Sequence, residues 1–242
     1  MVTKDEIIKA VDDFFAGNYE VTDGRTIPEV ADISFGKNGK EIELAMLFID
    51  IRESTKIVDS LRRVTAAKMY KSFLWGVAKI AKNNDGELRS FNGDGVLVAF
   101  IGDRKRTNAV KAGLQMSWFA KNILKPKLDE IFNNNESLKN QEIEFDFGIG
   151  IDVGKVLVVR GGIRGENNND LVWVGNATNY AVKLSNLSKE GKNIYISENV
   201  YKNMSDSSKY SNDNPKQNMW EERVWKAMDD AVIYRSGWTW SL

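Results

Sequence analysis

The sequence contains no cysteine and no histidine among its 242 residues. Disulfide bonds, thiolate metal sites and imidazole ligands are therefore excluded, and any metal held by side chains would be bound by oxygen. Oxygen ligands suit Mg²⁺ and Mn²⁺, the ions that accompany nucleoside triphosphates. The absence of cysteine also fits a reducing compartment.

Net charge and long apolar segments are absent as well. Lysine plus arginine and aspartate plus glutamate each number 34, so the chain has no overall electrostatic bias. This balance argues against a general nucleic-acid or membrane-surface binder. No apolar run approaches the roughly 20 residues that span a bilayer, and the charged N-terminal residues lack the core of a signal peptide. We therefore expect a cytoplasmic protein without a membrane span and without direct nucleic-acid contact.

Hydrophobic periodicity predicts an N-terminal extension followed by one larger domain. We expect residues 1–41 to form a helix and a loop, with an amphipathic helix over 3–16 that Thr3 caps. Residues 42–242 are predicted to form the main domain, which closes with tryptophan-bearing edge strands near 220–240. A lysine- and asparagine-rich stretch at 126–142 is interpreted as a solvated insertion.

Strand and helix patterns alternate through the main domain in the order β-α-β-β-α-β. The predicted elements cover residues 42–51, 53–82, 88–91, 96–100, 105–124, 143–151, 155–159, 171–174, 176–187 and 193–196. The segments 143–151 and 155–159 are predicted to form a hairpin that turns at 152–154. This order favours an α+β, ferredoxin-like (palm-type) fold, with an antiparallel or mixed central sheet and helices on its face.

Two aspartates occupy matching positions next to predicted strands. Asp50 lies near the end of the strand at 42–51, and Asp94 lies in the Asn-Gly-Asp-Gly turn of the hairpin over 88–100. Two carboxylates that converge at strand ends make an oxygen-lined site for divalent cations. Taken alone, Asp50 could be a helix N-cap and Asp94 an ordinary turn residue.

Four segments together resemble the class III nucleotidyl cyclases. They are FIDIREST at 48–55, FNGDGVLVAF at 91–100, GIGIDVGKV at 148–156 and VGNATNYAVKL at 174–184. The first two resemble the metal-binding motifs of that family, the third its glycine-bearing strand pair and the fourth its Gly-x-x-x-Asn-x-Ala-x-Arg helix. The resemblance implies that residues 42–242 are a cyclase catalytic domain, which acts as a head-to-tail homodimer.

The resemblance also implies a reaction and its metal ligands. The ribose 3′-oxygen attacks the α-phosphorus of the same nucleotide and expels diphosphate, with the help of two divalent cations, Mn²⁺ or Mg²⁺. The implied metal ligands are Asp50, Asp94 and the carbonyl oxygen of Ile51.

Substrate-binding and catalytic residues follow from the same motifs. The resemblance places the substrate phosphates near the backbone amides of Ser54 and Thr55 and near the charge of Arg52. Asn179 matches the position that orients the ribose, and Lys183 follows one helical turn later, where purine cyclases usually carry arginine. Lys183 could also be a solvated helix lysine. In the implied homodimer, the metal-binding aspartates of one copy face Asn179 and Lys183 of the other, so the active sites are shared.

The two positions that read a purine base depart from the family pattern. Purine cyclases generally carry a lysine where this chain has Ser90, and an aspartate or threonine where it has Val172. Sites that hydrogen-bond a base discriminate strongly, so the loss of both partners points to a different base. Ser90 and the neighbouring Arg89 are candidates for binding a smaller ring, although Arg89 could simply point to solvent.

These departures make the chain resemble the pyrimidine cyclases of bacterial Pycsar anti-phage systems. The favoured function is conversion of UTP to 3′,5′-cyclic UMP, a second messenger that activates a cyclic-nucleotide-dependent effector protein. A cytidylate cyclase that uses CTP is the first alternative. An adenylate or guanylate cyclase with atypical base contacts follows, and then a catalytically inactive, cyclase-like binding module. A diguanylate cyclase is disfavoured, because the sequence lacks a Gly-Gly-Asp/Glu-Glu-Phe segment.

Overall fold

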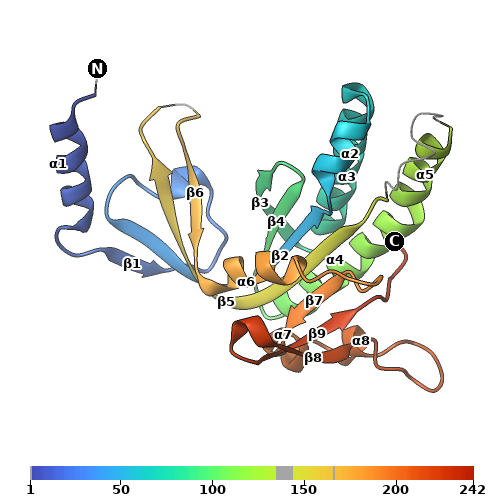
Figure 1. Cartoon of the computed structure of the whole chain (residues 1–242). Coiled ribbons are helices and arrows are strands. Elements are labelled where there is room, and N and C mark those ends of the chain that lie inside the picture. Colours follow the sequence, from blue (N-terminus) through green and yellow to red (C-terminus); the bar gives the residue numbers. More distant parts are fainter. Residues whose placement is uncertain (1, 135–143, 166) are drawn as a thin grey trace. The chain divides into compact units, whose positions relative to one another are not determined.

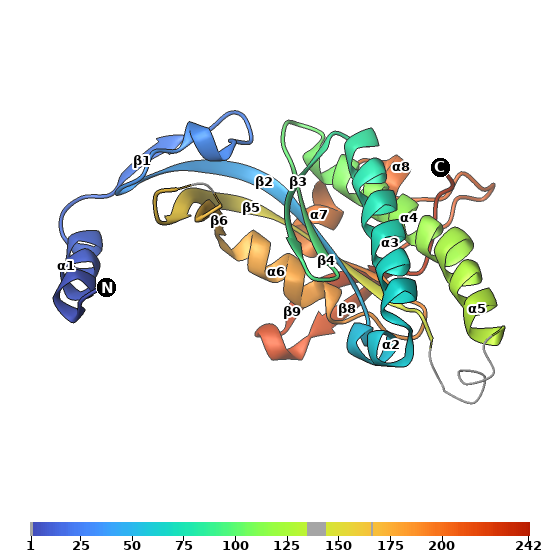
Figure 2. The ribbon, with the colours of Figure 1, turned by 90° about the horizontal axis from the view of Figure 1, so that it is seen from above.

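The computed structural model describes residues 2–134, 144–165 and 167–242. The chain divides into two compact units, Met1–Glu43 with Lys155–Gly175, and Leu44–Gly154 with Asn176–Leu242. Strands β2 (Asn38–Ile51) and β5 (Phe147–Gly162) contribute residues to both units. The sheet runs in the order β3-β4-β2-β5-β7-β9-β8, with β1 paired to β2 and β6 paired to β5 (Figure 1, Figure 2). The predicted domain boundary at residues 41 and 42 stays a prediction.

The smaller unit combines the N-terminal segment with a strand pair. Helix α1 (Lys4–Phe15) begins with a capping box, in which the Thr3 hydroxyl accepts a hydrogen bond from the Glu6 backbone N–H at 3.2 Å. The predicted N-cap is therefore confirmed. Part of the predicted loop forms elements of its own: β1 pairs in parallel with the start of β2, and β6 pairs antiparallel with the end of β5. The remaining bounds are β1 (Glu20–Asp23), η1 (Val30–Asp32, a 3-10 turn) and β6 (Asn169–Val174).

The larger unit places helices on both faces of its part of the sheet. Helices α3 (Arg63–Asn83) and α4 (Lys105–Phe119) cover one face, where Leu47 and Ile49 of β2 enter the main hydrophobic core. Helix α6 (Asn176–Ser185) lies on the other face (Figure 1). The other elements are α2 (Ser54–Ser60), β3 (Gly86–Asn92), β4 (Gly95–Phe100), the π-helical segment η2 (Ala120–Leu124), α5 (Lys125–Asn133), β7 (Ile194–Ser197), α7 (Glu198–Asn203), α8 (Asp206–Lys209), β8 (Glu221–Trp225), the 3-10 turn η3 (Lys226–Met228) and β9 (Ala231–Ser236).

The predicted α+β plan with a mixed sheet is confirmed. β4 pairs antiparallel with β2, whereas β7 pairs in parallel with β5. None of the described helices is long and apolar enough to cross a bilayer.

Helices differ from the prediction at two places. The helix predicted at 53–82 is broken into α2 and α3, because Leu61 adopts an extended backbone and buries its side chain in the core. The stretch 126–142 is not a solvated insertion throughout, since α5 covers its first part and buries Leu128 and Phe132, while residues 135–143 lie outside the described residues. These two apolar residues have helical i, i+4 spacing, but the surrounding lysines and asparagines dilute the signal.

The hairpin predicted over 143–159 is wrong. β5 runs through residues 152–154 without a turn. An aspartate and a glycine within three residues are typical of turns, but here the alternation of the strand continues, because Phe147, Ile149, Ile151 and Val153 all enter the main core. The long β5 therefore has a second face that carries the even-numbered residues of this segment.

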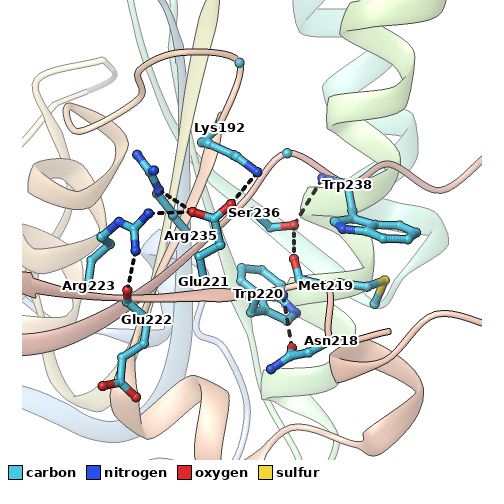
Figure 3. Close-up of polar contacts among 12 residues, drawn as sticks. Lys192, Asn218, Met219, Trp220, Glu221, Glu222, Arg223, Arg235, Ser236 and Trp238 are labelled. Atoms are coloured by element: carbon cyan, nitrogen blue, oxygen red, sulfur yellow. Dashed lines mark hydrogen bonds and ion pairs between the residues drawn. The ribbon is translucent and has the colours of Figure 1, made fainter. Parts of the chain in front are cut away.

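The C-terminal strands close the sheet and bury part of the tryptophan-rich tail. Of the two predicted edge strands, only β8 is at the edge, because β9 pairs with both β8 and β7. Trp220, just before β8, is 4% exposed and packs in the core. Figure 3 shows the polar contacts that hold these strands, centred on Glu221. Its carboxylate lies 2.6 Å from Lys192, 2.7 Å from Arg223 and 3.1 Å from Arg235.

Two glycines of β5 let α6 lie directly on the sheet. A Cβ atom at Gly148 would overlap the carbonyl oxygen of Ser185, and one at Gly150 would overlap the carbonyl oxygen of Ala181. Both obstacles are backbone atoms of a packed helix, so no change of side-chain rotamer can make room. The Gly-x-Gly sequence therefore sets how closely α6 approaches β5.

We expect Gly150→Ala to lower the free energy of unfolding by about 1–3 kcal/mol or more, because the methyl group must push α6 away from β5. Denaturant unfolding followed by circular dichroism measures this loss. The matched control is Gly154→Ala in the same strand, where a Cβ atom would meet only the Ala177 Cβ at 3.5 Å, an ordinary contact. Equal stability of the two variants would contradict the close approach of α6.

Candidate functional site

Asp50 and Asp94 meet at the end of the ladder between β2 and β4. Ile49 pairs with Val96, so Asp50 lies beside Gly95 and close to Asp94 in the turn that precedes it. Because Ile49 faces the main core, the next residue on the strand points to the opposite face. The two carboxylates are close enough for the charge of Asp94 to raise the pKa of Asp50.

The surroundings of Asp50 disfavour its negative charge. Burial raises the pKa of Asp50 to about 6 from an ordinary value of 3.8, the guanidinium of Arg52 opposes this rise, and Asp94 adds to it. The Asp50 Oδ1 atom is buried, lies 3.2 Å from Arg52 Nη2, and accepts no hydrogen bond from the described residues. A buried carboxylate oxygen without a hydrogen-bond donor, next to a second carboxylate, fits a divalent cation.

The pair of aspartates offers only two carboxylates to a metal ion. The described residues contain no group of three or more aspartate, glutamate, histidine or cysteine side chains that could hold a metal ion. Hard divalent cations take six or more oxygen ligands, and Mg²⁺ is often bound by only one or two carboxylates together with substrate phosphates. The arrangement therefore fits a cation that binds together with a triphosphate rather than one caged by protein alone.

The segment after Asp50 carries Ile51, whose carbonyl oxygen is predicted to bind metal, and the residues predicted near the phosphates. Ile51 ends β2 with its side chain buried in the core. Glu53 has a left-handed backbone with φ 49°, and Ser54 and Thr55 then begin α2, with Ser54 half-buried and Thr55 exposed. α2 has only 7 residues, so the partial charge at its N-terminus is limited. A role of these amides in binding phosphates stays a prediction.

A β-bulge in β3 turns Ser90 to the face that carries Asp50. Leu88 pairs with Val98, whereas Ser90 pairs with Leu97, so the register shifts by one residue between them. Leu97 pairs on β2 with the residue two positions before Asp50, and residues two apart on a strand share a face. Without the bulge, Ser90 would point into the main core.

Arg89 and Val172 have defined local partners. The Arg89 side chain is 9% exposed, and its Nη2 atom lies 3.2 Å from the Glu87 carboxylate, which also pairs with Lys82 at 2.5 Å. Arg89 therefore does not simply point to solvent. Val172 lies on β6 in the smaller unit, pairs with Val159 and is 47% exposed. That Arg89 and Val172 contact a base stays a prediction.

Asn179 and Lys183 share the exposed side of α6 and line a cavity of about 560 Å³. The cavity lies between α6, the end of β7 and the start of β9. The Lys183 Nζ atom is 3.7 Å from the Met228 sulfur. Neither Asp50 nor Asp94 is among the described residues that line this cavity. The predicted metal-binding and catalytic residues thus form two groups, one around the aspartates and one on α6.

The cavity also contains residues that the sequence did not single out. Burial raises the pKa of Asp152, and a hydrogen bond with Ser197 opposes that rise. Burial also raises the pKa of the Tyr180 hydroxyl, and the charge of Asp152 adds to it. The available signal was the alternation of Gly148, Gly150 and Asp152 on one strand face, which the predicted turn at 152–154 concealed.

The chain is similar to known proteins over most or all of its length. The profile of the adenylate and guanylate cyclase catalytic domain matches residues 38–221. A uridylate cyclase of Xanthomonas perforans is 36% identical over 244 residues, with 100% of each chain covered. A uridylate cyclase of Burkholderia cepacia is 32% identical over 246 residues, again with 100% of each chain covered.

Solved structures with the same fold include two purine nucleotide cyclases. The adenylyl cyclase CyaB from P. aeruginosa superimposes with a TM-score of 0.65 at 22% identity, covering 82% of this chain and 95% of that one. The guanylyl cyclase Cya2 has a TM-score of 0.60 at 21% identity, covering 84% and 95%. At this level of identity the likeness concerns the fold.

We expect Mn²⁺ binding to weaken by about tenfold for each pH unit below 6, because a proton on Asp50 competes with the cation. The pKa of Asp50 is raised in the folded protein, so its protonated form already dominates at a pH where an exposed aspartate is charged. Electron paramagnetic resonance of free Mn²⁺ measures the binding curve at each pH. Asp103→Asn, which changes an exposed loop aspartate, is the control and should leave the curve unchanged. A midpoint near pH 4 would contradict the raised pKa.

Proposed function

Because the chain belongs to the adenylate and guanylate cyclase catalytic domain family, we propose that it is a nucleotidyl cyclase that converts UTP to 3′,5′-cyclic UMP and diphosphate. The observation that carries this proposal is the full-length likeness to two uridylate cyclases. The convergence of Asp50 and Asp94 supports the reaction type, because it offers a carboxylate site for hard cations next to an exposed face.

The reaction joins the ribose O3′ atom to the α-phosphorus and breaks the bond from that phosphorus to the diphosphate oxygen. The 3′-hydroxyl loses its proton, and diphosphate leaves with the electron pair. Divalent cations, Mg²⁺ or Mn²⁺, held by Asp50 and Asp94 would supply Lewis acidity for the hydroxyl and the triphosphate. Asn179 would hydrogen-bond the ribose, and Lys183 would bring a positive charge to the phosphates as negative charge builds up there.

The active site is proposed to form between two copies of the chain. Within one copy, Asn179 and Lys183 line a cavity to which Asp50 and Asp94 do not contribute among the described residues. A head-to-tail homodimer would bring the aspartates of one copy to the α6 helix of the other and create two equivalent sites. Because each site needs residues from both chains, single inactivating substitutions should complement one another.

The base is proposed to be uracil. Uracil offers two carbonyl acceptors and one N–H donor, and the Ser90 hydroxyl can both donate and accept. Its position on the face of Asp50 supports a role near the nucleotide. Val172 has no hydrogen-bonding side chain, so it could contact a base only through apolar surface. The cytosine ring differs at one polar edge, which leaves CTP as the nearest competing substrate.

The product would act as a signal inside the cell. Nucleoside triphosphates are substrates of the cytoplasm, where we expect the protein to work. The family resemblance supports a downstream effector protein that is activated by the cyclic pyrimidine nucleotide in anti-phage defence. We expect this partner to interact with the product rather than with the cyclase.

Incubating the protein with the four ribonucleoside triphosphates and Mn²⁺ should yield cyclic UMP as the main product, identified by mass spectrometry. Cyclic CMP as the main product would replace the substrate by CTP, and a purine product would remove the pyrimidine assignment. No product from any nucleotide would indicate a binding module. Asp50→Ala and Asp94→Ala should each lower turnover by at least about 100-fold, because several kcal/mol of transition-state stabilisation are lost.

Mixing an Asp50→Ala chain with a Lys183→Ala chain should restore activity that neither variant has alone. Subunit exchange produces heterodimers in which one of the two sites contains only native residues, so the mixture should recover roughly a quarter of wild-type activity if pairing is random. The control is a mixture of Asp50→Ala with Asp94→Ala, which disables the same half of each site and should stay inactive. No recovery in the first mixture would count against shared sites.

A further inference from the structure

The guanidinium of Arg52 is held by partners from two parts of the chain. Its Nη2 atom lies 3.2 Å from Asp50 Oδ1 and also donates a hydrogen bond to the Ser185 carbonyl oxygen. Its Nη1 atom donates to Asn186 Oδ1 at 2.9 Å. Ser185 is the last residue of α6, and Asn186 follows it. Arg52 thus links the end of β2 to the C-terminal end of α6.

The structure provides a slot for this side chain. A Cβ atom at Gly148 would overlap Arg52 Nη2 and would lie 2.9 Å from its Nε. Only a residue without a side chain leaves this space between β5 and α6. The Arg52 side chain is 22% exposed, so most of it is shielded from solvent.

The backbone around the slot is fixed as well. The Arg52 backbone N–H donates to the Asp146 carbonyl oxygen at 2.9 Å. The Asp146 carboxylate accepts a hydrogen bond from the Asn193 amide at 2.7 Å, and that amide also donates to the Phe147 carbonyl at 2.8 Å. Asn193 is buried. The backbone that carries the guanidinium is therefore hydrogen-bonded to the residue just before β5.

We propose that Arg52 is a positioning residue, which holds Asp50 in place from the end of α6, and that it does not bind the substrate phosphates. This inference rests on the proposed cyclase function of Asp50. Both terminal nitrogens of Arg52 have protein partners, two hydrogen bonds to the end of α6 and an ion pair with Asp50, and the planar fork of arginine suits contacts in several fixed directions. A buried carboxylate that must bind a cation needs such support, because its own orientation decides where the cation lies.

The link also joins residues that serve different sites in the proposed homodimer. Asp50 would act with α6 of the other copy, whereas Arg52 ties Asp50 to α6 of its own copy. A change at the end of α6 would therefore be felt at Asp50 through Arg52. This gives Asn186 a role that a phosphate-binding arginine would not require.

The test uses the full chain and three variants: Arg52→Lys, Asn186→Ala and the double variant. Lysine keeps the positive charge but lacks the planar fork that pairs with Asp50 while donating hydrogen bonds to Ser185 and Asn186. We expect Arg52→Lys to weaken Mn²⁺ binding without nucleotide by about 10- to 100-fold, the range found when residues that orient metal ligands are changed. Asn186→Ala should also weaken Mn²⁺ binding. The double variant should bind Mn²⁺ no more than about twofold more weakly than Arg52→Lys does, because both changes break the same connection between Asp50 and α6. The apparent KM for UTP at saturating Mn²⁺ should stay within about twofold.

Asn203→Ala is the matched control, since it removes an exposed asparagine whose side chain, among the residues that the structure describes, donates hydrogen bonds to Asn199 of its own helix. Mn²⁺ binding that is unchanged in Asn186→Ala, together with a raised KM for UTP in Arg52→Lys, would assign Arg52 to the phosphates and overturn the proposal. Thermal unfolding of each variant checks the fold, and Asn186→Ala provides the decisive measurement if Arg52→Lys is unstable. Mn²⁺ binding needs no turnover, so an inactive wild-type protein would count against the proposed function and not against the link.

Discussion

The approach of the α6 backbone to β5 is the contact on which the rest of the candidate site depends. It exists because Gly148 and Gly150 have no side chains. α6 carries Asn179 and Lys183. Their positions are therefore set by the contact between the backbones of α6 and β5 and not by side-chain packing that could adjust. On its other face the same strand contributes Ile149 to the main core. One strand therefore fixes both the core and the helix that faces the cavity.

The aspartate pair lowers the stability of the folded protein at neutral pH. The pKa of Asp50 is about 6 in the folded protein rather than 3.8, so the folded state holds the proton more tightly than the unfolded state. The free energy of unfolding therefore falls as pH rises from about 4 to about 6. At neutral pH the buried charge lowers stability, and the nearby Asp94 adds repulsion. Arg52 offsets part of this through its ion pair at 3.2 Å. Such local conflict is typical of sites that are shaped for binding and not for stability.

The sequence predicted the parts of the site that depend on short segments. The convergence of Asp50 and Asp94 was predicted because a strand end and a turn are readable from a few residues, and the Thr3 cap was predicted because a cap is local. The partners of Arg52 were missed, since Ser185 lies 133 residues away along the chain and no local pattern encodes that distance. Local signals also misled: the aspartate and glycine of residues 152–154 resemble a turn, but pairing with neighbouring strands keeps β5 extended.

Because of the bulge in β3, the number of residues in this strand decides which side chain lies on the face of Asp50. Side chains alternate between the two faces of a sheet along a strand. The extra residue between Leu88 and Ser90 therefore moves the side chains that follow it to the opposite face. Deleting Ser90 would bring Arg89 to the position beside Leu97, so that an arginine would stand where the serine is now. The side chain at this position can therefore change by insertion or deletion as well as by substitution, and an alignment that misplaces a single gap in β3 would compare side chains from opposite faces of the sheet.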